Sequence, residues 1–234
     1  MDNLYIVMPA YNEEANIEAV VRAWYPVLNG KGPGSRLVVA DSGSTDGTHA
    51  VLAALCKELP SLEILENTLK QHGPKLIALY KLAIERGADY VFQTDSDGQT
   101  DPAEFEAFWD LRNEHDAVIG MRPVRGDGKA RKYVEKVVCL LVRFYFGAKV
   151  PDANAPFRLM KARLVEKYIN RMDSDYSLPN IVLTALFAHY GENITFREIS
   201  FKARGAGVNS IDLKKIFKIG FKSLSDFSKF KSEL

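Results

Sequence analysis

The chain has 234 residues, of which 47% are hydrophobic and 26% are charged, with a formal net charge of +1. This composition excludes a disordered chain and argues against a general nucleic-acid binder. Cys56 and Cys139 lie in apolar helical patterns, so we expect buried thiols rather than a disulfide framework or zinc site. Residues 176–191 form the longest uncharged stretch, which is too short and too polar to span a bilayer, and residues 4–8 are too few for a signal peptide. We therefore expect a cytoplasmic protein that works at most peripherally, at the inner face of a membrane.

The first half of the chain alternates apolar runs with segments of helical spacing. The runs predict strands over 4–8, 36–40, 62–65, 89–94 and 116–121. The helical spacing predicts helices over 12–24, 48–58 and 75–86 and from Pro102 onward. We expect Asn12 to cap the first of these helices, and Ser44 or Asp46 to cap the second. This alternation predicts an α/β fold with a mostly parallel sheet and helices on both faces.

The second half is less regular. We expect a Gly- and Arg-rich loop over 120–132, strands over 157–160 and 195–202, and helices over 132–147, 162–172 and 179–190. No internal repeat or linker divides the chain. We predict one domain over 1–210, with a first half to about 122 and a second half over about 123–210, followed by a separate helical segment over 211–234.

Asp95 and Asp97 follow a predicted buried strand, where two carboxylates at i and i+2 can face one cavity. Such hard oxygen ligands suit Mg²⁺ or Mn²⁺, which would neutralise a diphosphate. An EF-hand loop starting at Asp95 is excluded, because its sixth position is Thr100 rather than glycine. The string Asp95-Ser-Asp-Gly98 also resembles the start of haloacid-dehalogenase-type phosphatases, and a polar turn without function is the simplest alternative.

Polar clusters follow three predicted strands, over 9–14, 41–46 and 95–101. Ligands of open parallel sheets bind beyond the carboxyl ends of the strands, where these clusters would meet. Asp41 could there accept hydrogen bonds from a nucleotide base or ribose. This convergence is the main functional signal of the sequence.

Three motifs resemble glycosyltransferase family 2, which has the GT-A fold, a Rossmann-like sheet with a C-terminal acceptor-side extension. They are Pro9-Ala-Tyr-Asn-Glu13, Asp41-Ser-Gly-Ser-Thr-Asp-Gly-Thr48 and Thr94-Asp-Ser-Asp-Gly-Gln-Thr-Asp-Pro102, and the resemblance runs from residue 4 to about 122. It implies a nucleotide-sugar donor (a UDP- or GDP-sugar), one divalent metal and inversion at the anomeric carbon.

The resemblance also implies roles for individual residues. Asp95 and Asp97 would flank the diphosphate, with Asp97 as the more direct metal ligand and Asp95 beside it. The nucleotide-sugar donor would be bound by residues of all three motifs: Pro9, Tyr11, Glu13, Asp41, Asp95 and Gln99.

The second half resembles the polyprenyl-phosphate glycosyltransferases, the dolichol-phosphate mannosyltransferase-like branch of the family. The resemblance rests on Gly120-Met-Arg122 with Arg131, on Pro151-Asp-Ala-Asn-Ala-Pro-Phe-Arg158, and on Glu198-Ile-Ser-Phe-Lys-Ala-Arg204. The chain departs from that pattern at three positions, where Pro156 replaces a glycine, Ser200 a proline and Glu135 a serine.

Two acceptors follow from these residues. A polyprenyl phosphate is already anionic, so it needs no strong base, and Arg122, Arg131 and Arg204 could hold it. A saccharide hydroxyl would require a carboxylate base, for which Asp152 and Asp175 are the candidates.

The segment 211–234 combines apolar residues at helical spacing with lysines. Such a helix can lie in a membrane interface, or it can pack on the domain or in a homodimer. We predict a metal-dependent inverting glycosyltransferase that acts on polyprenyl phosphate at the cytoplasmic membrane face. The alternatives are transfer to a saccharide hydroxyl during surface-polysaccharide assembly, a phosphatase, and a non-catalytic sugar-nucleotide-binding protein.

Overall fold

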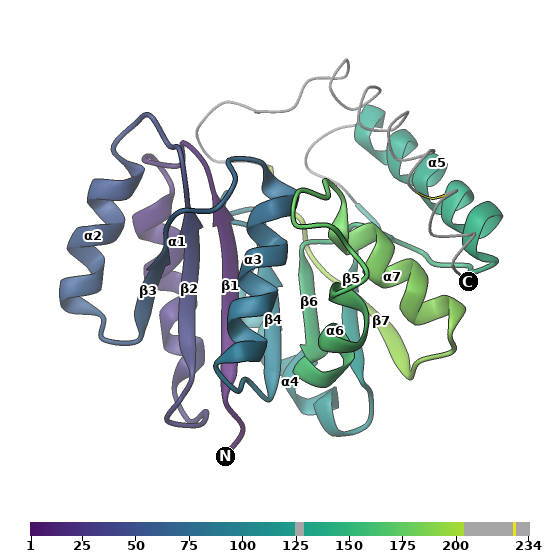
Figure 1. Ribbon diagram of the computed structural model, residues 1–234, viewed down its shortest axis with the longest axis horizontal. Coiled ribbons are helices and arrows are strands. Elements are labelled where there is room, and N and C mark those ends of the chain that lie inside the picture. Colours follow the sequence, from purple (N-terminus) through teal and green to yellow (C-terminus); the bar gives the residue numbers. More distant parts are fainter. Residues whose placement is uncertain (125–128, 204–226, 228–234) are drawn as a thin grey trace.

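A computed structural model describes residues 1–124, 129–203 and 227. Its centre is a seven-stranded sheet in the order β3-β2-β1-β4-β6-β5-β7 (Figure 1). The strands are β1 Leu4–Ala10, β2 Arg36–Asp41, β3 Leu62–Leu65, β4 Tyr90–Thr94, β5 Ala117–Met121, β6 Phe157–Lys161 and β7 Ile194–Glu198. The predicted α/β fold with a mostly parallel sheet is confirmed.

Pairing in the sheet is parallel except at one strand. β1 pairs in parallel with β2 and with β4, and β2 pairs in parallel with β3. β6 runs antiparallel to both β4 and β5, which lie on either side of it. β4 and β5 therefore point the same way, and their carboxyl ends lie at one edge of the sheet.

Helices cover both faces of the sheet (Figure 1). One face packs against α1, α2 and α4, and the other against α3, α5, α6 and α7. The helices are α1 Ile17–Trp24, α2 Thr48–Glu58, α3 His72–Glu85, α4 Phe105–Trp109, α5 Lys129–Phe146, α6 Ala162–Ile169 and α7 Pro179–His189, with short 3₁₀ turns at Tyr25–Leu28, Pro102–Glu104 and Asp110–Asn113.

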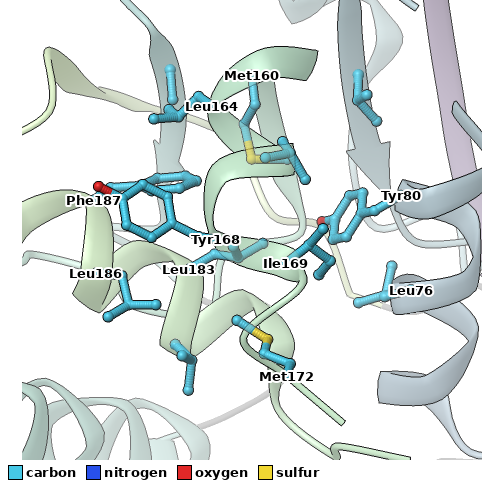
Figure 2. Close-up of a cluster of buried hydrophobic side chains, with 14 of the residues drawn as sticks. Leu76, Tyr80, Met160, Leu164, Tyr168, Ile169, Met172, Leu183, Leu186 and Phe187 are labelled. Carbon is cyan, nitrogen blue, oxygen red and sulfur yellow. The ribbon is translucent and has the colours of Figure 1, made fainter. Parts of the chain in front are cut away.

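The core forms two layers because successive strand residues point to opposite faces. In β1, Ile6 and Met8 enter the layer under α1, whereas Val7 enters the layer under α3. Figure 2 shows part of the second layer, where residues of α6 and α7 meet Leu76 and Tyr80 of α3. Both faces of the central strands are therefore buried, as their continuous apolar runs indicate.

The predicted start of the first helix is wrong. α1 begins at Ile17, with Asn16 at its N-cap, whereas Asn12 has a left-handed backbone with φ of 55°. The Asn12 side chain instead accepts a hydrogen bond from the Thr45 amide at 2.8 Å. Asn12 therefore forms a contact between two loops instead of capping a helix. Helical spacing alone could not indicate this contact.

Other boundaries also moved. α3 begins three residues before the predicted Lys75, α6 ends at Ile169 rather than 172, and β7 ends at Glu198 rather than 202. Both cysteines are free, but they are half-buried rather than fully buried. Apart from Phe227, the predicted segment 211–234 lies outside the described residues. Within the described part, no helix has the length and apolar character needed to cross a bilayer.

Candidate active site

The three polar motifs meet at one edge of the sheet. They follow β1, β2 and β4, which are adjacent and parallel, so their carboxyl ends lie side by side. The Ser96 hydroxyl donates to the Pro9 carbonyl at 2.8 Å, which ties the loop after β4 to the end of β1. The predicted convergence of these motifs is confirmed.

The loops after β1 and β2 hold each other in place. The amide of Asn12 donates to Ser44 Oγ at 3.1 Å, and the amide of Glu13 donates to Thr48 Oγ1 at 2.8 Å. Glu13 is buried, whereas the neighbouring Tyr11 is 40% exposed. An exposed aromatic ring beside buried polar groups is suited to contact a planar ligand.

Asp41 ends β2 and is buried at the base of this region. Its Oδ1 accepts a hydrogen bond from the Ser44 hydroxyl, and its Oδ2 lies 3.3 Å from Nδ1 of the half-exposed His49. The sequence did not single out His49, although it lies in the first turn of α2, close to the second motif. The Asp41 carboxylate thus lies between Ser44 of the loop after β2 and the half-exposed side chain of His49.

Asp95 and Asp97 lie in the loop after β4 and are both half-buried. Asp95 Oδ1 accepts from Gln93 Nε2 at 3.1 Å and lies 3.3 Å from His72 Nε2, while Asp97 Oδ1 accepts from the Gln99 amide at 3.1 Å.

Asp95 and Asp97 are the residues of this loop that could bind a metal ion. Within the described residues, no group of three or more His, Cys, Asp or Glu side chains is arranged to do so alone. Two carboxylates nevertheless fit a Mg²⁺ or Mn²⁺ ion whose other ligands are phosphate oxygens and water. This loop could therefore hold such an ion through Asp95 and Asp97.

Gln99 connects the third motif to the second half of the chain. Its buried side-chain amide donates to the Lys202 carbonyl at 2.7 Å, and the Lys202 amide donates back to the Gln99 carbonyl at 2.9 Å. Lys202 also pairs with Asp101 at 2.7 Å. The segment that leads from β7 toward residue 204 is thus fixed beside the carboxylate loop.

Lys75 lies beside the first motif, although the sequence did not single it out. It lies in the first turn of α3 with its side chain almost fully buried, and Nζ donates to the Ala10 carbonyl while lying 5.5 Å from the Tyr11 ring centre. Burial lowers the pKa of Lys75 to about 8, although the charge of Asp41 opposes this effect. The sequence does carry one indication of this burial. Lys75 lies four residues before Leu79, so it falls on the same apolar face of the helix as that buried residue.

A second charged cluster lies at the end of β5. Arg122 Nε and Nη2 donate to the two carboxylate oxygens of Asp152 at 2.8 and 2.9 Å, and Nη2 lies 3.5 Å from Glu135 Oε2. Glu135 of α5 also accepts from the Ala153 amide at 2.8 Å. One buried cation thus joins β5, α5 and the segment before β6.

The two carboxyl groups of this cluster differ in proton affinity. Burial raises the pKa of Glu135, the charge of Asp152 raises it further, and Arg122 opposes both. Burial also acts on Asp152, but its hydrogen bonds and the charge of Arg122 hold the pKa of Asp152 below its usual value. Because both oxygens of Asp152 contact Arg122, the geometry favours an ion pair over a free base.

The structure also describes two of the three remaining predicted residues. Arg131 is half-buried in the first turn of α5, and Asp175 is exposed in the loop between α6 and α7. That loop reaches α3, because a Cβ at Gly73 would lie 2.4 Å from the carbonyl oxygens of Tyr176 and Ser177. Arg204 lies outside the described residues.

Comparisons with known proteins identify the family of the chain. The family described as Glycosyl transferase family 2 matches residues 5–169. The chain is 27% identical over 209 residues to an undecaprenyl-phosphate mannosyltransferase of Micrococcus luteus, covering 86% of this chain and 84% of the relative. It is 24% identical over 232 residues to an undecaprenyl-phosphate 4-deoxy-4-formamido-L-arabinose transferase of Shewanella sediminis, covering 97% of this chain and 67% of the relative.

The fold is similar to that of solved GT-A glycosyltransferases. One is the glucosyl-3-phosphoglycerate synthase of Mycobacterium tuberculosis in complex with Mn²⁺, UDP-glucose and glycerol 3-phosphate. It aligns with a TM-score of 0.71 at 18% identity, covering 98% of this chain and 80% of the other. At that identity the likeness supports the fold.

The lowered pKa of Lys75 predicts a pH dependence of stability. Between about pH 8 and 10.5 Lys75 is protonated in the unfolded chain but not in the folded chain, so its contribution to folding stability rises with pH in this window. The increase reaches on the order of 3–4 kcal/mol, at about 1.4 kcal/mol for each unit of pKa difference. The difference in free energy of unfolding between the unaltered protein and Lys75→Met, measured with urea at several pH values, should rise by this amount, because the other titrating groups are the same in both proteins.

The exposed Lys81 of the same helix provides the control, because Lys81→Met should keep the pH dependence of the unaltered protein. Parallel stability curves for the unaltered protein and Lys75→Met across this pH window would contradict the assignment.

Proposed function

We propose a reaction for this chain, which belongs to glycosyl transferase family 2 and is therefore a glycosyltransferase. It transfers a sugar from a nucleotide-sugar donor to a polyprenyl phosphate. The observation that carries the proposal is the meeting of three polar motifs at the carboxyl ends of β1, β2 and β4, with a cluster containing Arg122 at the end of β5 on the same edge.

The donor would lie across the first two motifs and Lys75. Asp41 would accept hydrogen bonds from the base or ribose, and Tyr11 would pack against the nucleotide beside Pro9 and Glu13. Lys75, whose Nζ lies 5.5 Å from the centre of the Tyr11 ring, would place a positive charge near the donor at neutral pH. Because this lysine is held by the Ala10 carbonyl, it needs little rearrangement to bind an anion.

The diphosphate of the donor would lie beside Asp95, Asp97 and Gln99. A bound Mg²⁺ or Mn²⁺ ion would neutralise the charge that grows on the leaving nucleoside diphosphate. Asp97 would hold the ion directly, with Asp95 beside it. Both carboxylates are presented by a loop whose neighbouring groups Ser96 and Gln99 are buried and hydrogen-bonded, which keeps their spacing fixed.

The acceptor would be a phosphate group. Its anionic oxygen attacks the anomeric carbon as the bond from that carbon to the diphosphate oxygen breaks, which inverts the configuration. Arg131 is more accessible than Arg122, and Arg204 would complete the set of acceptor-side cations. The two relatives described above, which are named as undecaprenyl-phosphate transferases, support this acceptor.

Transfer to a saccharide hydroxyl is the second candidate, and one observation favours it. Asp175 is exposed in a loop that contacts the start of α3, where His72 lies near Asp95, so a carboxylate is available close to the third motif. Asp152 is less suited to act as base, since Arg122 occupies both its oxygens. A hydroxyl acceptor would therefore depend on Asp175.

A polyprenyl phosphate acceptor would bring the enzyme to a membrane surface, because a polyprenyl chain stays in the bilayer. α5 offers an apolar stripe for this contact: Tyr133 is 71% exposed, Leu140 65% and Phe144 69%, with Val137 between them. Exposed basic side chains flank the stripe at Lys132, Lys136 and Arg143. Such an arrangement suits an anionic lipid surface, and Glu135 on the opposite face of α5 reaches the Arg122 cluster.

The donor is tested by calorimetric binding of UDP and GDP, each with and without Mn²⁺. We expect one nucleotide to bind, more tightly with Mn²⁺, and Asp97→Ala to lose the gain from the metal. Turnover of Asp97→Ala should fall more than about 100-fold, because the metal contributes several kcal/mol to transition-state stabilisation. Asp110→Ala removes an exposed carboxylate beyond α4 and should behave as the unaltered protein.

Near-normal turnover of Asp97→Ala would contradict the metal role. Nucleotide binding without turnover on any acceptor would instead identify a binding protein.

The acceptor is tested by steady-state kinetics with undecaprenyl phosphate. Arg131→Ala should raise the KM for this acceptor about tenfold or more, the usual cost of a lost charge-assisted hydrogen bond, and leave the KM for the donor unchanged. Arg163→Ala, which removes an exposed arginine at the start of α6, is the matched control. Equal effects on both substrates would argue against the role of Arg131, and activity on a saccharide that is lost in Asp175→Asn would favour the second candidate.

Membrane contact is tested by flotation with vesicles that contain phosphatidylglycerol. The double substitution Val137→Glu and Leu140→Glu should reduce vesicle binding at least about tenfold, because each change places a charge in the apolar stripe. Leu69→Glu alters another exposed leucine, before α3, and should bind as the unaltered protein. If the double variant floats normally but no longer dimerises in light scattering, the stripe is an interface between copies.

A further inference from the structure

Three buried side chains form a directed line of hydrogen bonds behind Asp95. The Tyr80 hydroxyl donates to Asn180 Oδ1 at 2.8 Å, and Asn180 Nδ2 donates to Gln93 Oε1 at 2.9 Å. Gln93 Nε2 then donates to Asp95 Oδ1 at 3.1 Å. Each amide accepts on one side and donates on the other, so the line has one direction and ends on the carboxylate.

The line joins three elements that are distant in sequence. Tyr80 belongs to α3, Gln93 to β4 and Asn180 to the first turn of α7. All three side chains are at most 2% exposed. Buried amides are costly unless each polar atom is paired, so their orientation is fixed by their partners rather than by solvent.

Arg158 fixes the far side of this line. It lies opposite Gln93 in the β4–β6 pair, and Nη1 donates to the Asn180 carbonyl at 3.1 Å. Nη2 donates to Thr184 Oγ1 at 3.0 Å, one turn further along α7. The guanidinium is fully buried, and none of the carboxylates in the described ranges forms an ion pair with it, so its hydrogen bonds to oxygens of α7 and the segment before β6 hold these elements together.

Asp95 has one oxygen engaged and one directed elsewhere. Gln93 and His72 both approach Oδ1. Among residues 1–124 and 129–203, no group hydrogen-bonds to Oδ2. The donated bond from Gln93 therefore sets the rotation of the carboxylate and leaves Oδ2 for a ligand.

We infer that Gln93 and Asn180 are positioning residues that orient Asp95 toward the diphosphate and its metal ion. This inference rests on the proposed function, because it assigns the second oxygen of Asp95 to that ligand. Gln93 acts directly through its donated hydrogen bond, and Asn180 acts through Gln93 by fixing which end of that amide faces Asp95. Neither residue touches the substrate.

The direction of the line makes a sharp test possible with two substitutions of nearly unchanged volume. Gln93→Met removes the donor to Asp95. Asn180→Asp replaces the donating amide with a second oxygen, so Gln93 must turn its own amide to donate to the introduced carboxylate and present its oxygen to Asp95. Both changes should therefore weaken the same ligand contact, one of them from two residues away along the line.

Calorimetry should measure binding of the nucleoside diphosphate preferred by the unaltered protein, with Mn²⁺, and binding of the corresponding nucleoside without metal. In both variants we expect the Kd of the diphosphate with Mn²⁺ to rise about tenfold or more, as is usual when a partner that orients a metal ligand is removed. The Kd of the nucleoside should stay within about twofold, because Asp41 and Tyr11 lie outside the line.

Leu183→Ala is the control for general destabilisation, since Leu183 is a buried residue of α7 that takes no part in the line. It should lower the melting temperature and leave both Kd values unchanged. If folded Gln93→Met and Asn180→Asp bind the diphosphate with Mn²⁺ as the unaltered protein does, the inference is wrong and the proposed function stands. It is also wrong if they lose nucleoside and diphosphate binding equally. If the unaltered protein binds neither UDP nor GDP, the proposed function itself fails.

Discussion

The parallel pairing of β1 with both β2 and β4 is the constraint on which the rest of the structure depends. Parallel neighbours bring their carboxyl ends to one edge, so loops that are distant in sequence become adjacent. The bonds from Ser96 to Pro9 and from Asn12 to Ser44 are possible only with this pairing. A site with many polar groups is thereby built on strands that are themselves apolar and rigid.

Much of this edge could be predicted from the sequence, and for a physical reason. A strand buried on both faces is a continuous apolar run, and the polar residues that end it are conspicuous, as at Asp41 and Asp95. The structure confirms that these motifs converge, and the family match agrees with the resemblance that they carry. The antiparallel direction of β6 could not be predicted, because a short apolar run carries no information on the direction of its neighbours.

The roles of residues that contact distant parts of the chain were harder to predict from the sequence. Lys75 has a basic side chain whose burial depends on the Ala10 carbonyl, and Asn12 forms a contact with Thr45 in place of a local cap. Glu135 departs from the serine of the resembling branch, and the structure shows what it contacts: Arg122 and the Ala153 amide.

The placement of β6 also bears on how this enzyme could be recombined with its relatives. β6 comes late in the chain, yet it lies between β4 and β5, and its residue Arg158 lies across from Gln93. A chimera that joined residues 1–122 to the remainder of another transferase would therefore separate two strands that share one ladder. A chimera designed to exchange acceptor preference would therefore have to keep residues 157–161 from the same protein as residues 1–122. Only the segments on either side of that strand would be replaced.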